Sequence, residues 1–210
     1  ISGVAYAIKK LRPECKVYGV QAAGAPSMVN SIHDGKLEKL DSVSTIADGI
    51  AVKEPGVNTF ELVKKYVDDV VTVSEDEICS AILALIEQHK MIAEGAGAVS
   101  VAAAMFNKVP VEGKKVVCLV SGGNIDVTIL SRVIKRGLYK TGRSCALCVE
   151  LIDKPGQLRI VSEIIASKGG NVISVSHERG SETEDINGCF LRLELETRNY
   201  AHIEEIVSAL

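Results

Sequence analysis

A run of five apolar residues that ends in a serine and two glycines constrains this chain more than any other feature. Val116 to Val120 lead directly into Ser121, Gly122 and Gly123, and a polar helical pattern begins near Asp126. Such a run predicts a buried strand, and the turn after it lies at the carboxyl edge of a sheet, where open α/β sheets bind ligands. Gly-Gly is also common in plain strand-to-helix turns. The pattern therefore predicts an unhindered hydroxyl, either in a binding site or in an ordinary turn.

Segments of strand and helix periodicity alternate over the first two thirds of the chain. Predicted strands cover residues 16–20, 70–73 and 115–120, and predicted helices cover 1–11, 27–35, 58–67, 74–93, 96–106 and 127–136. Asn58 or Thr59 is the expected cap of the third helix, and Ser74 with Glu77 predicts a capping box. Strands separated by helices favour an α/β fold with a doubly wound, mostly parallel sheet.

A second pattern follows a pair of glycines, Gly137 and Gly142, which predict a linker at residues 138–143. After it we expect a strand at 144–152, a helix at 158–168, strands at 172–178 and 188–197 around a polar hairpin, and a last helix to residue 210 capped by Asn199. This βαββα order is a ferredoxin-like unit without its final strand, so one sheet edge is expected to lack a partner. The predicted domains are residues 1–137 and 144–210.

The ends and the composition restrict what the chain is and what it binds. A helical pattern begins at Ile1 without a cap or an initiator methionine, so we expect a piece of a longer polypeptide, truncated at both ends. The net charge is −3, and acidic and basic residues are interspersed, so the sequence predicts no nucleic-acid partner. No apolar run has the length of a membrane span.

Six scattered cysteines, mostly in apolar runs, indicate free thiols in a reducing cytoplasm. Cys145 and Cys148 form a CxxC without further ligands, which we interpret as structural.

Four motifs, taken together and in this order, resemble the threonine dehydratases, or threonine ammonia-lyases, which are pyridoxal-phosphate enzymes of fold type II. The motifs are TIADGIAV at residues 45–52, VTVSEDEI at 71–78, EGAGA at 94–98 and SGGNID at 121–126. The resemblance covers roughly residues 1–140 and implies that they form the C-terminal part of a catalytic domain. DKPGQL at 153–158 and GNV at 170–172 resemble an ACT domain, a regulatory module that senses small molecules.

The resemblance implies that the Ser121 hydroxyl meets the pyridine nitrogen of pyridoxal phosphate and that Gly122, Gly49 and Glu94 line the cofactor. A neutral hydroxyl does not hold this nitrogen protonated as an aspartate would, which favours loss of the β-hydroxyl over transamination. Gly49 could instead simply form a turn, and Glu94 could be a solvated helix-end residue. No lysine stands in the family's Ser-Phe-Lys or Ser-Tyr-Lys context, so no catalytic residue is predicted here and the Schiff-base lysine is expected upstream.

The resemblance to an ACT domain implies an effector site around Gly156, Gln157 and Leu158, where the free N–H groups of a helix start could bind a carboxylate, with Asn171 nearby. A plain turn is the alternative. The implied effector is isoleucine or valine, bound between paired modules of a homodimer or homotetramer. Residues 21–27 lack the acidic side chains that hold a divalent cation in the related serine racemases, so no metal is predicted there.

The resemblance implies that this chain is part of a lyase of amino-acid metabolism and isoleucine biosynthesis. The expected reaction is β-elimination of water from L-threonine, which gives 2-oxobutanoate and ammonia, with allosteric regulation through the ACT domain. The piece alone is expected to be inactive. An L-serine dehydratase, or an effector-binding and oligomerisation module without catalysis, are the alternatives.

Overall fold

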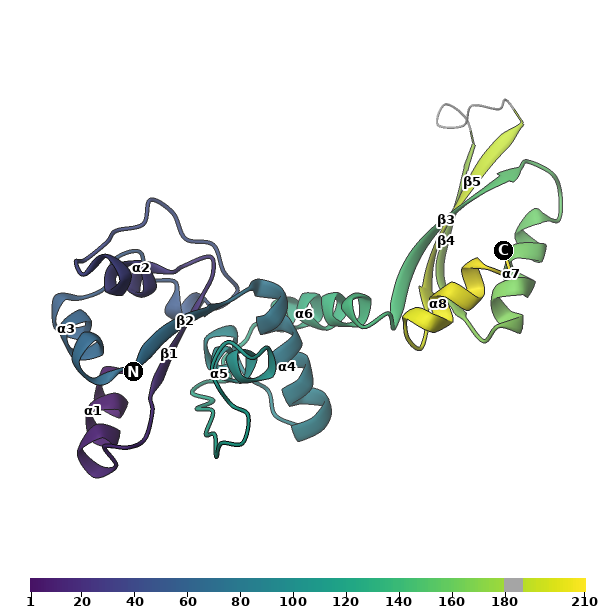
Figure 1. Ribbon diagram of the computed structural model, residues 1–210. Helices are drawn as coiled ribbons and strands as arrows, with labels where there is room; N and C mark the ends of the chain where they lie inside the picture. Colours follow the sequence, from purple (N-terminus) through teal and green to yellow (C-terminus); the bar gives the residue numbers. More distant parts are fainter. Residues whose placement is uncertain (180–186) are drawn as a thin grey trace. The chain divides into compact units, whose positions relative to one another are not determined.

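The computed structural model describes residues 1–179 and 187–210 and divides the chain into two compact units, Ile1–Ile134 and Lys135–Leu210 (Figure 1). The polar hairpin predicted between the last two strands falls on residues 180–186, outside the described residues. Among the described helices, none has both the length and the hydropathy needed to cross a membrane.

The first unit consists of helices around a two-stranded parallel sheet. Its elements are α1 (Ser2–Leu11), β1 (Tyr18–Ala22), α2 (Ser27–Asp34), the 3-10 helix η1 (Asp48–Ile50), α3 (Val57–Tyr66), β2 (Asp69–Val73), α4 (Glu75–His89), α5 (Gly95–Met105) and the start of α6 (Val127–Lys140). Strand β1 pairs with β2 in parallel, with Tyr18 opposite Asp69 and Ala22 opposite Val73. Small residues on α5 let it pack closely against α4, and Val133 of α6 completes the core.

Local signals predicted several helix ends correctly. Ser74 and Glu77 form the expected capping box: the Ser74 hydroxyl accepts the Glu77 N–H at 3.3 Å, and the Glu77 carboxylate accepts the Ser74 N–H at 2.7 Å. Gly35 ends α2 in the left-handed conformation, with φ of 71°. These signals hold because each acts within one turn of its helix.

Other helix ends differ from the prediction. Helix α3 is capped by Gly56, which has no side chain to accept a hydrogen bond, and not by Asn58 or Thr59. Thr59 lies inside the helix, and its hydroxyl donates to the Gly56 carbonyl at 2.8 Å. Helix α4 ends at His89, four residues earlier than predicted. Helix α6 runs through Gly137 to Lys140, so the predicted break there is wrong. One glycine costs a helix only about 1 kcal/mol, which the surrounding turns can offset.

The strand predicted at residues 115–120 is not formed. This segment is neither helix nor strand, and Val117 is 93% exposed. A strand needs a neighbour to complete its hydrogen-bond ladder, and within the described residues the parallel sheet consists of β1 and β2. The segment lies along α5 instead, where the Ser100 hydroxyl donates to the Leu119 carbonyl at 3.0 Å. The predicted doubly wound sheet is thus present only as one parallel pair flanked by helices.

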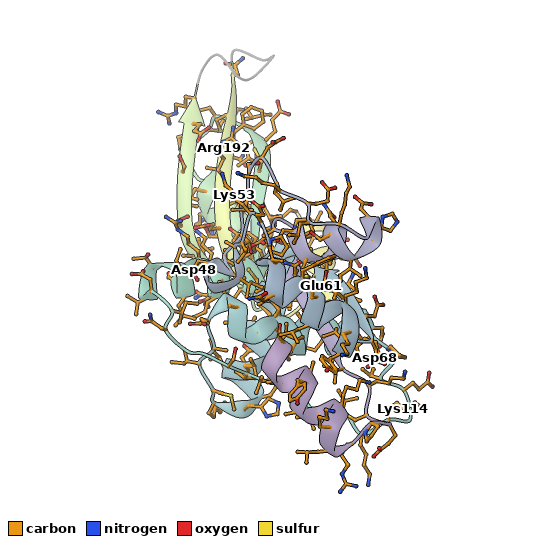
Figure 2. The ribbon with its side chains drawn as sticks, turned by 90° about the vertical axis from the view of Figure 1, so that its left-hand side faces the viewer. Asp48, Lys53, Glu61, Asp68, Lys114 and Arg192 are labelled. Atoms are coloured by element: carbon orange, nitrogen blue, oxygen red, sulfur yellow. The ribbon has the colours of Figure 1, made fainter. Side chains whose placement is uncertain are left out.

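Asp68 joins the start of β1 to α1. Its carboxylate accepts hydrogen bonds from Lys9 at 2.6 Å, from Lys16 at 2.8 Å and from the Val17 N–H at 2.8 Å, and Figure 2 shows it beside α1. Partial burial opposes ionisation, but hydrogen bonds from both lysines and from Val17 outweigh it and hold the pKa of Asp68 well below its ordinary value.

The second unit is an antiparallel sheet with two helices on one face (Figure 1). Its elements are β3 (Ser144–Ile152), α7 (Gln157–Ser167), β4 (Asn171–Arg179), β5 (Gly188–Glu196) and α8 (Tyr200–Val207), in the spatial order β3-β5-β4. The predicted βαββα order is confirmed. Alternate β5 residues face the helices, so Leu191, Leu193 and Leu195 are buried against Val161 and Ile165 of α7. Within the described residues β3 pairs with β5 alone, which leaves its other edge without a strand.

The buried His202 fastens α8 to the end of α7. Its Nδ1 accepts the Arg198 N–H at 3.0 Å, so Nε2 carries the proton and donates to the Lys168 carbonyl at 2.9 Å. The His202 backbone N–H donates to the Asn199 side chain at 2.9 Å, which confirms Asn199 as the cap of α8.

Candidate functional site

Three segments that are far apart in the sequence meet around Glu94, the residue that precedes α5. Its backbone N–H donates to the Gly122 carbonyl at 3.1 Å, and its carboxylate Oε2 accepts the Asn124 N–H at 3.2 Å. The segment around Ile46 also lies here, because that residue's carbonyl is packed against Gly95. The half-buried Glu94 is therefore held between the segments 45–50 and 121–124.

The motif at residues 71–78 also contacts the region around Glu94. The carboxylate of Glu75, at the start of α4, accepts the Ile46 N–H at 2.8 Å through Oε2. Its second oxygen, Oε1, is buried and has no hydrogen-bond partner within the described chain. All four sequence motifs therefore belong to one region of the first unit.

Position 122 has no room for a side chain, because the Glu94 carboxylate occupies the space where a β-carbon would lie. A β-carbon at position 122 would lie 2.6 Å from the Glu94 Cδ, closer than non-bonded carbons approach. A β-carbon at Gly97 would lie 2.6 Å from the Gly122 carbonyl oxygen, and one at Gly95 would lie equally close to the Ile46 oxygen, at 2.6 Å. These glycines let the three segments pack backbone against backbone.

Gly49 has more room than these glycines. It lies in η1, next to the Asp48 labelled in Figure 2, and is exposed. A β-carbon there would lie 3.2 Å from the Ala96 Cβ and 3.7 Å from Glu94 Oε1. The structure thus brings together Gly49, Glu94 and Gly122, three of the four residues predicted to line a cofactor.

Ser121, the fourth of these residues, directly precedes Gly122 and is exposed. Gly123, which follows Gly122, approaches the Ile92 carbonyl, because a β-carbon added at Gly123 would lie 2.9 Å from that oxygen. With a glycine as its next neighbour, the Ser121 hydroxyl is open to a small molecule, to which it can donate or from which it can accept a hydrogen bond. This region therefore offers a carboxylate held by backbone groups and an accessible hydroxyl.

Gln21 has a structural role at the place compared with the metal site of serine racemases. Its side-chain oxygen accepts the N–H groups of Met28 and Val29, both at 2.9 Å, and so caps the start of α2. An amide oxygen with two donors is already satisfied in its hydrogen bonding.

The residues predicted to bind an effector do not all meet within one chain. Gly156, Gln157 and Leu158 line a cavity of about 330 Å³ at the start of α7 in the second unit. Asn171 lies beyond the other end of α7, a helix of 11 residues that is about 16 Å long. Its amide donates to Glu196 at 2.8 Å. The expectation that Asn171 is near the helix start is therefore wrong within a single chain, because α7 separates them.

The same cavity is lined by three side chains that the sequence did not single out, His177, Arg179 and Cys189, and by Asp153 of the DKPGQL motif. Their sequence separation hides the grouping, which depends on the pairing of β4 with β5 that places Arg179 opposite Cys189. Alternation along β4, which puts His177 and Arg179 on one face, was the one signal available.

Comparison with known proteins gives consistent matches. A family model described as pyridoxal-phosphate dependent enzyme matches residues 1–122. L-threonine ammonia-lyase of Thermotoga maritima is 51% identical over all of this chain and 52% of its own length, and that of Geobacter sulfurreducens is 45% identical over the same shares, 100% and 52%. The solved structure of threonine deaminase isoform 2 from Solanum lycopersicum matches 64% of this chain and 38% of its own, with a TM-score of 0.60 and 36% identity. The chain thus spans about half the length of the curated relatives it matches.

Proposed function

Because this chain belongs to the family of pyridoxal-phosphate dependent enzymes, we propose that it forms the ring-facing part of the active site of a threonine ammonia-lyase. The proposed reaction converts L-threonine to 2-oxobutanoate and ammonia. The observation that carries the proposal is the meeting of Gly49, Glu94 and Gly122 beside the accessible Ser121 hydroxyl. Similarity to two L-threonine ammonia-lyases over the whole chain supports threonine as the substrate.

The residues present fit the cofactor at the edge of its ring. Bound pyridoxal phosphate withdraws electrons from the amino acid attached to it, which makes the α-proton acidic. Ser121 presents a neutral hydroxyl that can hydrogen-bond a ring nitrogen without protonating it. The exposed Gly49 presents no side chain to a flat group. Glu94, held by Gly122 and Asn124, keeps the segment that carries Ser121 in place.

The activity is tested with the full-length protein, because the chain spans about half the length of its relatives. We expect purified protein loaded with pyridoxal phosphate to release ammonia and 2-oxobutanoate from L-threonine, and Ser121→Ala to lower kcat. Ser208→Ala, an exposed serine in the second unit, serves as the control. If L-serine alone is deaminated, the threonine assignment is wrong; if neither substrate reacts, the lyase assignment is wrong.

For the second unit we propose the role of an ACT regulatory domain that binds isoleucine or valine between paired copies, in a homodimer or homotetramer. Its βαββα order and the cavity beside Gly156 and Gln157 support this proposal. The outer edge of β3, which pairs with no other strand of the described residues, can pair with the same strand of another copy. In calorimetry on the intact oligomer we expect heat from isoleucine or valine and none from lysine. Absence of heat from both branched amino acids would contradict the proposal.

We propose a cytoplasmic location because the cysteines form no disulfide bonds within the described residues. All six lie within the described residues and are free thiols. Free thiols, three of them buried, are typical of proteins from a reducing compartment.

A further inference from the structure

Three metal-ligating side chains from separate segments meet in the cavity at the start of α7. Asp153 follows β3, His177 lies on β4 and Cys189 lies on β5, and each residue offers one ligand atom within 4.8 Å of the other two. Within the part of the chain that the structure describes, this is the one cluster of its kind.

The distances between the three ligand atoms are close to those around a bound metal ion and too long for hydrogen bonds between the side chains. His177 Nε2 lies 3.8 Å from Asp153 Oδ1, too far for a hydrogen bond. Zinc binds nitrogen and oxygen at about 2.0–2.2 Å and sulfur at about 2.3 Å, so two ligands of a tetrahedral ion lie about 3.3–3.7 Å apart. The separations, all of which are within 4.8 Å, would therefore shorten by at most about 1.5 Å if all three atoms bound one ion.

The burial of the three groups favours a fixed site. Cys189 is 1% exposed and is held by pairing to both Leu151 and Arg179 in the centre of the sheet. The side chains of Asp153 and His177 are 30% and 35% exposed, so both can adjust while Cys189 stays in place. Because all three line the cavity, a fourth position is left for water.

Arg179 competes for Asp153 and has to be displaced. Its Nε lies 2.8 Å from Asp153 Oδ2, and its second amino group donates to Oδ1 at 3.2 Å. The Arg179 side chain is 68% exposed, so it can turn into solvent when a cation takes its place. Thiolate and carboxylate together neutralise a divalent ion, whereas neutral imidazole adds no charge.

We propose that Asp153, His177 and Cys189 bind one divalent transition-metal ion, with Zn²⁺ as the preferred ion, in a tetrahedral site completed by water. Thiolate, imidazole and carboxylate form the ligand set that zinc accepts, while calcium and magnesium require oxygen ligands. The site shares the cavity of the second unit with the proposed effector residues Gly156 and Gln157, and it is independent of the proposed lyase chemistry of the first unit.

Cobalt(II) titration of the reduced, chelator-treated chain tests this proposal, because a cobalt–thiolate bond absorbs in the near ultraviolet and a tetrahedral site absorbs strongly in the visible. We expect one equivalent of Co²⁺ to produce both bands and one equivalent of Zn²⁺ to remove them. His177→Gln is expected to weaken Co²⁺ binding by at least about tenfold, the size of effect seen even for residues that only support a ligand. Cys189→Ser is expected to remove the thiolate band.

Matched variants separate this site from adventitious binding. Cys148→Ser removes an exposed thiol outside the cluster, and His33→Gln removes an exposed imidazole, so both should bind Co²⁺ as the unmodified chain does. Loss of the thiolate band in Cys148→Ser, or unchanged affinity in His177→Gln, would overturn the proposal. Because His177 is at the surface of the cavity, His177→Gln also serves if Cys189→Ser fails to fold.

Discussion

Glu94 and Gly122 are joined by a hydrogen bond of 3.1 Å from the Glu94 N–H to the Gly122 carbonyl, and the Glu94 carboxylate fills the space of the missing Gly122 side chain. This pair links the start of α5 to the segment that carries Ser121. It shows that the glycine after Ser121 is required by the packing of the protein itself. The same packing determines where the Ser121 backbone lies.

Gly122→Ala is therefore expected to lower the free energy of unfolding by about 1–3 kcal/mol, the usual cost of forcing an extra carbon into a packed site. The added carbon would lie 2.6 Å from the Glu94 Cδ and would displace it. Urea denaturation followed by circular dichroism measures the change. Gly3→Ala is the control, since nothing lies within 4 Å of a β-carbon there, and it should be neutral or stabilising.

Asp68→Asn is expected to destabilise the first unit by roughly 1 kcal/mol at neutral pH, because the ion pairs with Lys9 and Lys16 are partly exposed. The pKa of Asp68 is lowered in the folded state, so its contribution is complete above the unfolded pKa of about 3.9 and is lost progressively as pH falls from that value through the lower folded-state pKa. Unfolding free energies of both proteins, measured from pH 7 to pH 3, should converge toward acid pH. A difference between the two proteins that stays constant over this pH range would contradict the account.

His202→Phe is expected to destabilise α8 by about 2 kcal/mol or more, because it leaves the Arg198 N–H and the Lys168 carbonyl without their partners in a buried place. Hydrogen exchange of the α8 amides measures this directly. The α1 amides in the other unit provide the internal reference. His33→Phe, at a side chain that is 87% exposed, should leave exchange unchanged. Equal protection of α8 in both variants would show that the histidine does not fasten the helix.

Ser121→Asp is expected to change the products of the full-length enzyme. An aspartate would hold the pyridine nitrogen protonated, which favours transamination over loss of the β-hydroxyl. The ratio of pyridoxamine phosphate formed to 2-oxobutanoate released from L-threonine measures the change. We expect this ratio to rise while Ser208→Asp leaves it unaltered. An unaltered ratio in Ser121→Asp would count against a role for the hydroxyl in reaction choice.

Features set by neighbours in the sequence were predictable, and features set by distant partners were not. The capping box of Ser74 and Glu77 was predicted because it closes within one helical turn. The strand at 115–120 was predicted wrongly because apolar periodicity does not reveal whether a neighbouring strand is present. The cluster of His177 and Cys189 was missed because strand register alone brings these residues together.

The sequence predicted which residues form the candidate site, but it did not predict what each residue does in the packing of that site. The motifs identified Gly49, Glu94 and Gly122, and the structure brings them together. The packing of Gly122 against Glu94 was not foreseen, since a glycine in a sequence does not show whether ligand or protein requires its small size.

We propose that the Ser121 hydroxyl hydrogen-bonds the ring nitrogen of the cofactor. Nitrogen NMR of the full-length protein loaded with ¹⁵N-labelled pyridoxal phosphate measures the protonation of this nitrogen. We predict the chemical shift of an unprotonated, hydrogen-bonded pyridine nitrogen. Ser121→Asp should move this signal to the pyridinium position, and Ser208→Asp should leave it in place. A pyridinium signal in the unmodified protein, or a signal that Ser121→Asp does not move, would contradict the claim.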